Sequence, residues 1–268
     1  MTSGNPPRPV QVHLVAGGKY HDIDHARLEL LKLFAEEPRI RATVAMDFGD
    51  LDRLSECALL VSYTVDVLPT REETAAIRGW IEAGGRWLVL HGTNSILRFR
   101  DDGLVDCPAE RDDVMALIGT QFVAHPPIGA FRVEVAPERA HHPLVAGEAD
   151  FEVVDELYLQ RIVADDLTVF LRTRFSGEAT GFVESHWQDA EVPILAERRQ
   201  GAGRVLYYAL GHSRGHYDLG IFTPFFAHPE RCAWNYPVHT RLLRRCIRWG
   251  IGELGGELGG ELGDEPEG

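Results

Sequence analysis

Histidine residues follow three separate strands expected in this chain, and an imidazole can transfer protons or bind a metal ion near neutral pH. His21 comes after the first strand, His91 after a short apolar strand, and His212 after a late one. In an open α/β sheet the parallel strands end on one edge, and ligands bind there. We therefore expect these three imidazoles to meet in one pocket.

A divalent metal such as zinc is the cofactor that this histidine set suggests, with His21, His91 and His212 as candidate ligands. The sequence does not identify the cofactor further. No H-E-x-x-H motif, no G-x-S-x-G motif and no phosphate-binding P-loop occurs.

His91 has the most informative position, directly after an apolar strand and before Gly92. Related architectures hold a nucleophile at such a strand-to-helix elbow. We predict that His91 and His212 are catalytic and move a proton. The alternative for His91 is that its ring hydrogen-bonds the loop backbone and shapes the pocket.

The segment Asp155-Glu156-Leu157-Tyr158 carries two carboxyl groups and a phenol. In an extended chain Glu156 and Tyr158 lie on one side and Asp155 on the other. At most one carboxylate then shares a pocket with the tyrosine. We predict that Glu156 and Tyr158 are catalytic and position hydroxyl groups or stabilise an enolate, whereas the alternative is a solvated acidic turn.

The first half of the chain alternates between strand and helix patterns. Strands are expected at 10–16, 40–46, 58–62 and 87–90, and the first helix at 24–37. The next helix follows Thr70, which stands three residues before Glu73 in capping-box spacing. This rhythm predicts right-handed βαβ units and an α/β fold with a doubly wound sheet.

The second half is less regular and predicts mainly strands. A short helix is expected at 111–118 and a last helix from Pro237. The expected strands are at 130–135, 151–154, 157–163, 168–172, 181–186, 193–197 and 205–209. We predict a flexible N-terminus (1–9), one domain (10–251) and a disordered acidic tail (252–268) that repeats G-E-L-G.

The charge balance argues against two classes of partner. The chain has 27 Lys and Arg against 41 Asp and Glu, for a net charge of -14. Nucleic acids and anionic membranes both attract basic surfaces, so neither is an expected partner.

The four cysteines form no C-x-x-C pair, and no secretory signal is evident, so we expect reduced cysteines and a cytoplasmic location.

Several segments, in order along the chain, resemble the ThuA-like (trehalose utilisation) family. The most specific are F-E-V-V-D-E-L-Y at 151–158 and G-A-G-R-V-L-Y-Y-A-L-G-H at 201–212. The others are V-H-L-V-A-G-G-K-Y-H-D at 12–22, W-L-V-L-H-G-T at 87–93, H-P-L-V-A-G at 142–147 and R-L-L-R-R-C-I-R-W-G at 241–250.

The resemblance implies a flavodoxin-like, class I glutamine-amidotransferase-like fold with additional β-rich insertions. It also implies use of trehalose or related keto-disaccharides. Amidotransferases of this class carry a cysteine at the elbow, where this chain has His91, so thiolate hydrolysis of glutamine is not expected. The predicted substrate-binding residues are His21, Asp22, Thr93, Asn94, Asp155 and His142.

Two functions follow as hypotheses, both with a small-molecule sugar as partner. The first is an enzyme that acts on a sugar or keto-sugar by acid–base or metal-assisted chemistry. The second is a non-catalytic binding or assembly domain, and a metal-dependent hydrolase of another small molecule is a further alternative.

Proteins of this size and pathway are often homodimers, although no residue pattern identifies an interface. The long aromatic segments 96–107 and 213–235 suit either sugar stacking or core packing.

Overall fold

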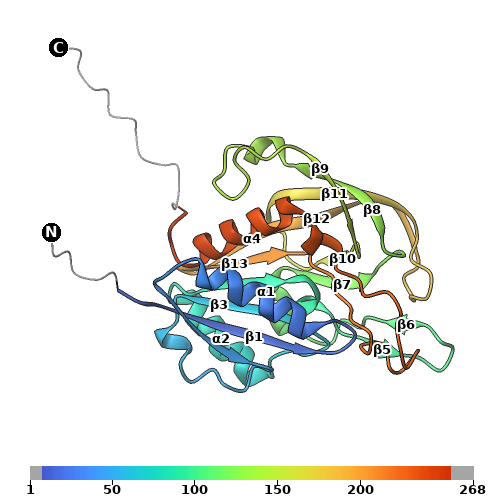
Figure 1. The fold of residues 1–268 in the computed structure, drawn as a ribbon, viewed down its shortest axis with the longest axis horizontal. Helices are drawn as coiled ribbons and strands as arrows, with labels where there is room; N and C mark the ends of the chain where they lie inside the picture. The colour runs from blue at the N-terminus through green and yellow to red at the C-terminus, as the bar shows by residue number, and fades with distance from the viewer. Residues whose placement is uncertain (1–7, 255–268) are drawn as a thin grey trace, which may run out of the picture.

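A nine-stranded mixed sheet forms the centre of the computed structural model, which describes residues 8–254 (Figure 1). Across the sheet the strands are β2 (Ile40–Ala45), β1 (Val10–Gly18), β3 (Leu59–Val65), β4 (Arg86–Leu90), β13 (Gly203–Tyr208), β12 (His186–Gln200), β11 (Thr168–Glu178), β8 (Gly129–Val135) and β9 (Phe151–Asp155). The first five strands pair in parallel and the rest pair antiparallel. The parallel order is that of a flavodoxin-like fold, which confirms the predicted fold class.

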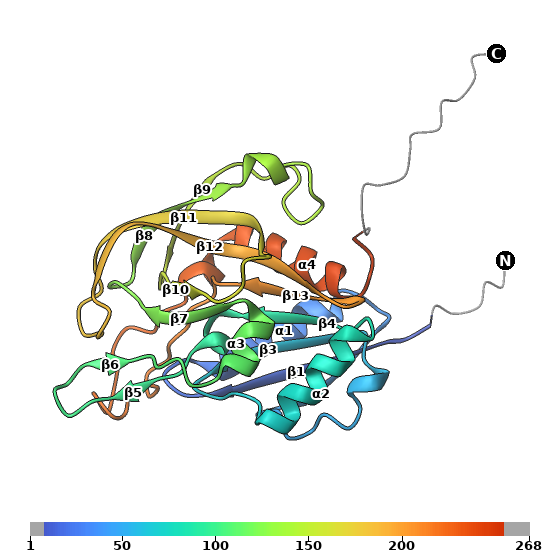
Figure 2. The ribbon, with the colours of Figure 1, turned by 180° about the vertical axis from the view of Figure 1, so that it is seen from behind.

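Four helices cover the parallel half of the sheet. Helices α1 (Ile23–Ala35) and α4 (Pro237–Gly250) lie on one face (Figure 1). Helices α2 (Arg71–Glu82) and α3 (Asp112–Ile118) lie on the other (Figure 2). Every residue of β3 is consequently buried, and its sequence LLVSYTV is continuously apolar except for two small hydroxyl residues.

The capping box predicted at Thr70 starts α2. The Thr70 hydroxyl accepts the backbone N–H of Glu73, and the Glu73 carboxylate accepts the backbone N–H of Thr70. This reciprocal arrangement satisfies two donors that the first turn leaves without a helical partner. Ile77 and Ile81 then bury one face of the helix against the sheet.

The antiparallel half departs most from expectation. Strands β11 and β12 form a much longer hairpin than predicted, because their outer ends carry polar residues and give no apolar signal. The strand predicted at 181–186 is wrong: residues 181–185 form a turn in which Phe182 makes a bridge to Val105, and only His186 belongs to a strand, as the first residue of β12. Two small sheets were not expected: β7 (Thr120–Ala124) with β10 (Leu159–Ile162), and β5 (Arg98–Phe99) with β6 (Val105–Asp106).

Short 3₁₀ segments connect several of these elements: η1 (Leu54–Glu56), η2 (His91–Asn94), η3 (Pro137–Arg139) and η4 (Cys232–Asn235).

All four cysteines are free. No helix between residues 8 and 254 combines the length and apolar character needed to cross a lipid bilayer. Most of the predicted flexible N-terminus and acidic tail, residues 1–7 and 255–268, lies outside the described residues.

Candidate functional site

The end of β1 brings His21 to the carboxyl edge of the sheet. Gly17 and Gly18 pass so close to the backbone carbonyl oxygens of Met46 and Val65 that a Cβ at either glycine would overlap them. The chain then turns through Tyr20, which has a positive φ of 67°. This turn buries the His21 side chain directly before α1 begins.

The end of β4 holds His91 in a strained elbow. His91 has a φ of 43°, in the left-handed region that few non-glycine residues adopt. Its Nδ1 lies 2.7 Å from the carbonyl oxygen of Ala209, and its ring stacks on Tyr158 at 4.1 Å between centroids. The ring is therefore fixed in orientation, and its Nε2 points away from β13 toward His21.

Hydrogen bonds between the Asp155 carboxylate and the backbone position His212, which follows the end of β13. The Asp155 carboxylate accepts the backbone N–H groups of Gly211 and His212, at 2.8 and 3.1 Å. It also accepts the backbone N–H of Glu156 at 2.8 Å. Asp155 is fully buried and does not line the pocket, and its hydrogen bonds fix two site segments relative to each other.

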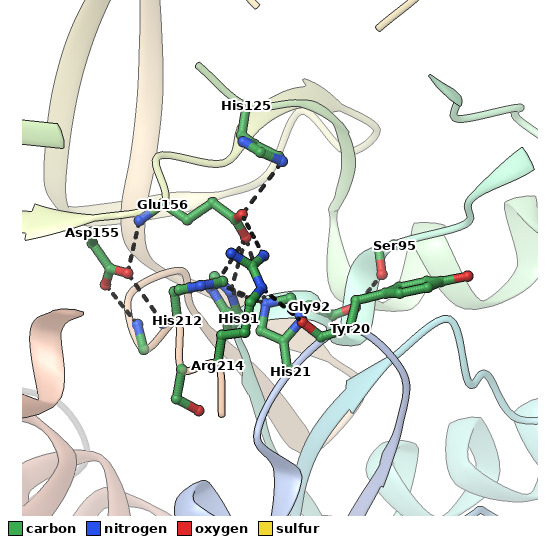
Figure 3. A network of polar contacts seen from close by, with 12 residues as sticks. Tyr20, His21, His91, Gly92, Ser95, His125, Asp155, Glu156, His212 and Arg214 are labelled. Carbon is green, nitrogen blue, oxygen red and sulfur yellow. Dashed lines mark hydrogen bonds and ion pairs between the residues drawn. The ribbon is translucent and has the colours of Figure 1, made fainter. Parts of the chain in front are cut away.

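These segments bring three imidazoles and one carboxylate together, as Figure 3 shows. His21 Nε2 lies 3.0 Å from His91 Nε2 and 3.0 Å from His212 Nδ1. Glu156 Oε2 lies 3.0 Å from His212 Nδ1, 3.5 Å from His21 Nε2 and 3.7 Å from His91 Nε2. The four donor atoms all lie within 4.8 Å of one another, which is the spacing of a candidate metal site.

Burial and charge set the protonation of this cluster. Burial lowers the pKa of His21 to about 3, so that its ring is neutral at pH 7. Burial also disfavours a charged His212, yet the facing carboxylates of Glu156 and Glu230 outweigh it and raise the pKa of His212 to about 9. Burial opposes ionisation of Glu156 too, but His125 and His212 hold its pKa well below the usual range.

A pocket of about 280 Å³ opens above the cluster. His21, Glu156 and Tyr158 belong to its lining, whereas His91 and His212 are fully buried behind them. Much of the wall is aromatic and comes from five elements or loops: Tyr20, Phe99, Phe122, Phe182 and Phe222. The exposed rings of Phe99 and Phe222 meet at 5.7 Å, so the β5–β6 hairpin and the loop at 213–231 touch at the rim.

Two of the predicted substrate-binding residues support the elbow from within the core. Thr93 donates its hydroxyl to the carbonyl of Ser62 and accepts the N–H of Thr64. Asn94 donates its side-chain amide to Thr120. Both residues are fully buried and neither lines the pocket.

Two further predicted residues lie apart from the pocket. Asp22 caps α1 by accepting the N–H of His25, and it forms an ion pair with Arg231 at 2.9 Å. His142 packs its ring against Phe170, with 4.4 Å between the centroids. The structure thus places His21 in the pocket, and Asp22, Thr93, Asn94, Asp155 and His142 outside its lining.

Three site residues were missed in the sequence. His125 Nε2 lies 3.3 Å from Glu156 Oε1, Arg214 lies 3.7 Å from the same oxygen, and Glu230 Oε2 lies 2.9 Å from His212 Nε2. His125 directly follows β7, a fully buried strand after Gly119 whose last three residues are apolar, a short signal that the sequence did offer. Arg214 and Glu230 sit in a long irregular loop, where no pattern marks them.

The family model described as ThuA, trehalose utilisation, matches residues 11–227 of this chain. No curated protein sequence matches it.

Solved structures share the fold at low sequence identity. A ThuA-like protein from Bacteroides uniformis ATCC 8492 has 16% identity and a TM-score of 0.65, covering 94% of this chain and 96% of its own. A ThuA-like protein from Parabacteroides merdae ATCC 43184 has 14% identity and a TM-score of 0.62, covering 94% and 93%. A β-galactosidase from Rahnella sp. R3 has 8% identity and a TM-score of 0.55, covering 92% of this chain but 31% of the galactosidase.

Proposed function

Because the chain belongs to the ThuA family of trehalose utilisation, we propose that it acts on a small sugar or keto-sugar bound in the pocket above His21 and Glu156. The observation that carries this proposal is the composition of the pocket. Proton-transfer groups lie at its floor and aromatic rings form its walls. Sugars present both hydroxyl groups and apolar ring faces, and this combination of polar and aromatic groups suits them.

The polar groups at the floor differ in what they offer a ligand. Burial raises the pKa of Tyr158 well above its usual value, so the phenol stays protonated and can donate a hydrogen bond. Glu156 remains a carboxylate and can accept a hydrogen bond or a proton. His125 and Arg214, which flank Glu156, supply donors for ligand oxygens.

The buried histidines then act through the residues in front of them. His91 contacts His21, and His212 contacts both His21 and Glu156. We therefore assign proton acceptance at the ligand to the Glu156 carboxylate, with Tyr158 stabilising an oxygen that gains negative charge. His91 and His212 hold these groups in place and adjust their charge.

Glutamine hydrolysis through a thiolate is not part of this proposal. His91 occupies the elbow, and no cysteine lines the pocket in the described part of the chain. Burial also raises the pKa of Cys107 to about 12, and it raises the pKa of Cys232 and Cys246, so these thiols are poor nucleophiles.

The test is turnover and binding of mono- and disaccharides together with their keto forms. We expect at least one keto-sugar to be converted, and Tyr158→Phe to lower kcat by about 100- to 1,000-fold. Glu152→Gln is the matched control, because Glu152 lies on β9 close to Glu156 in sequence but is exposed. Calorimetric binding without turnover would favour the non-catalytic alternative. The absence of both binding and turnover would contradict the proposal.

A further inference from the structure

The four donor atoms at the centre of the site enclose a space of the size that a metal ion occupies. Four ligands about 2.0–2.1 Å from a zinc ion in tetrahedral geometry are separated by roughly 3.3 Å. Five of the six separations here run from 3.0 to 3.7 Å, and the sixth, between His91 and His212, does not exceed 4.8 Å. Only a small adjustment would bring all four donors to one ion.

In two of the rings, the nitrogen that points away from the centre of the site already donates a hydrogen bond. His91 Nδ1 faces the carbonyl oxygen of Ala209, and His212 Nε2 faces the carboxylate of Glu230. Both oxygens only accept hydrogen bonds, so these two nitrogens carry hydrogen. The inner nitrogens, His91 Nε2 and His212 Nδ1, are then the ones that offer a lone pair, in the case of His212 once the metal has displaced its proton. Metal-binding histidines are typically oriented in this way by a carbonyl or carboxylate behind them.

Hydrogen bonds can join these four atoms only in pairs. His21 Nε2 lies 3.0 Å from two other ring nitrogens, and a single hydrogen on it can serve one of them only. Glu156 Oε2 faces the same three nitrogens and accepts but cannot donate as a carboxylate. One positive ion at the centre would interact favourably with all four donors at once.

The surroundings leave an open side toward the pocket. His91 and His212 are fully buried, while His21 and Glu156 also line the pocket. The second oxygen of Glu156 is held by His125 and Arg214, which leaves Oε2 turned to the histidines (Figure 3). With four protein donors, water or substrate could join the ion only as a fifth ligand, and the pocket lies on the side of His21 and Glu156 from which it would approach.

We propose that these four donors bind one divalent transition-metal ion of the zinc or iron(II) type. Three imidazoles and one carboxylate suit such ions, whereas magnesium and calcium prefer oxygen ligands only. The proposal makes Glu156 a metal ligand, and an ion bound there would polarise a ligand oxygen that enters from the pocket. It rests on the proposed function only for that last role, since metal binding depends on the donors and not on the substrate.

The experiment measures metal directly. Full-length protein is analysed for metal content, stripped with a chelator, and titrated with Co²⁺, whose visible absorption reports nitrogen and oxygen coordination. We expect about one ion per chain, with visible bands that saturate at one equivalent. Sugar turnover is measured separately, so a metal-binding protein that converts no sugar would refute the proposed function and leave this inference standing.

Variants locate the ion. Glu156→Gln and His21→Gln should each weaken Co²⁺ binding about 100-fold or more, since losing even an orienting partner of a ligand costs 10- to 100-fold. His13→Gln is the matched control: like His21, His13 is a buried histidine, but it lies within β1 and bonds to Thr43. Circular dichroism identifies variants that fail to fold. If a variant does not fold, the affinity of the native protein for Co²⁺ is measured instead, by competition with a chelator of known affinity. The inference is overturned if native protein takes up no Co²⁺, or if the site variants bind it as tightly as the control.

Discussion

The Nε2 atoms of His21 and His91 lie 3.0 Å apart although seventy residues separate them in the chain. Strands β1 and β4 are not neighbours in the sheet, because β3 lies between them. The contact forms because both strands run in the same direction and end at the same edge. The site thus depends on the whole parallel half of the sheet, and on Asp155, which ties the β13 exit to the start of the Glu156 segment.

Replacing Asp155 by Asn should destabilise the protein by about 1–3 kcal/mol, because an amide keeps one acceptor oxygen and leaves a buried N–H group without a partner. Asp155 accepts three backbone N–H groups, from Gly211, His212 and Glu156. Urea denaturation measures the change in the free energy of unfolding. Glu152→Gln, on the exposed side of β9, should change it by less than about 0.5 kcal/mol. Equal effects in the two variants would mean that Asp155 does not anchor these segments.

The aromatic rim should contribute to affinity and not to chemistry. Phe99 is 47% exposed and Phe222 is 65% exposed, and their rings meet at the mouth of the pocket. Each change to Ala should raise KM for a sugar several-fold, as expected from about 1 kcal/mol of ring stacking, with kcat nearly unchanged. Phe225→Ala is the control, because Phe225 is similarly exposed but stacks on His216 outside the pocket. A fall in kcat with constant KM would assign the rim a different role.

The sequence predicted best what depends on neighbours in the chain or on the direction of the strands. The Thr70–Glu73 capping box is a local pattern, and it forms as expected. The convergence of His21, His91 and His212 needed only parallel strands, which short apolar runs indicated. The alternation of side chains also placed Glu156 and Tyr158 together in the pocket lining.

Contacts made through irregular loops could not be predicted in this way. Arg214 and Glu230 pair across the loop that follows β13, where neither period nor motif sets their positions. Thr93 and Asn94 were predicted to bind substrate because they follow a strand that ends at the expected ligand-binding edge. The short η2 segment instead turns both of them into the core, where they hold the elbow.

Close packing around the elbow makes Gly92 sensitive to an added methyl group. A Cβ there would lie 2.5 Å from Val65 Cγ2, 3.0 Å from the carbonyl oxygen of Thr64 and 3.2 Å from the Tyr158 hydroxyl. Gly92→Ala should therefore cost about 1–3 kcal/mol in the free energy of unfolding. Gly79→Ala is the matched substitution, because no atom lies within 4 Å of its added Cβ in α2, and it should stabilise by about 0.5–1 kcal/mol. Thermal melting distinguishes the two, and a neutral Gly92→Ala would show that the elbow is loosely packed.

Acid sensitivity should come in part from His239, which lies outside the pocket. Its ring stacks on Tyr208 and meets Trp234 edge-on, and its Nε2 has no hydrogen-bond partner among the described residues. Burial lowers the pKa of His239 to about 3, from 6.5 in the unfolded chain. Between these values the unfolded state binds the extra proton, so stability is fully present above pH 6.5 and falls as the pH drops toward 3.

His239→Gln should flatten the pH dependence of stability between pH 7 and pH 4. The native protein should lose up to about 1.4 kcal/mol more per pH unit than the variant within this window, which is the largest slope that one proton allows. Carboxylates held by arginines add a similar slope to both proteins, so the informative quantity is the difference between the two urea-denaturation curves. His186→Gln is the control, because His186 is exposed and should leave the slope unchanged. Parallel curves for native protein and His239→Gln would show that the buried ring takes up its proton without loss of the fold.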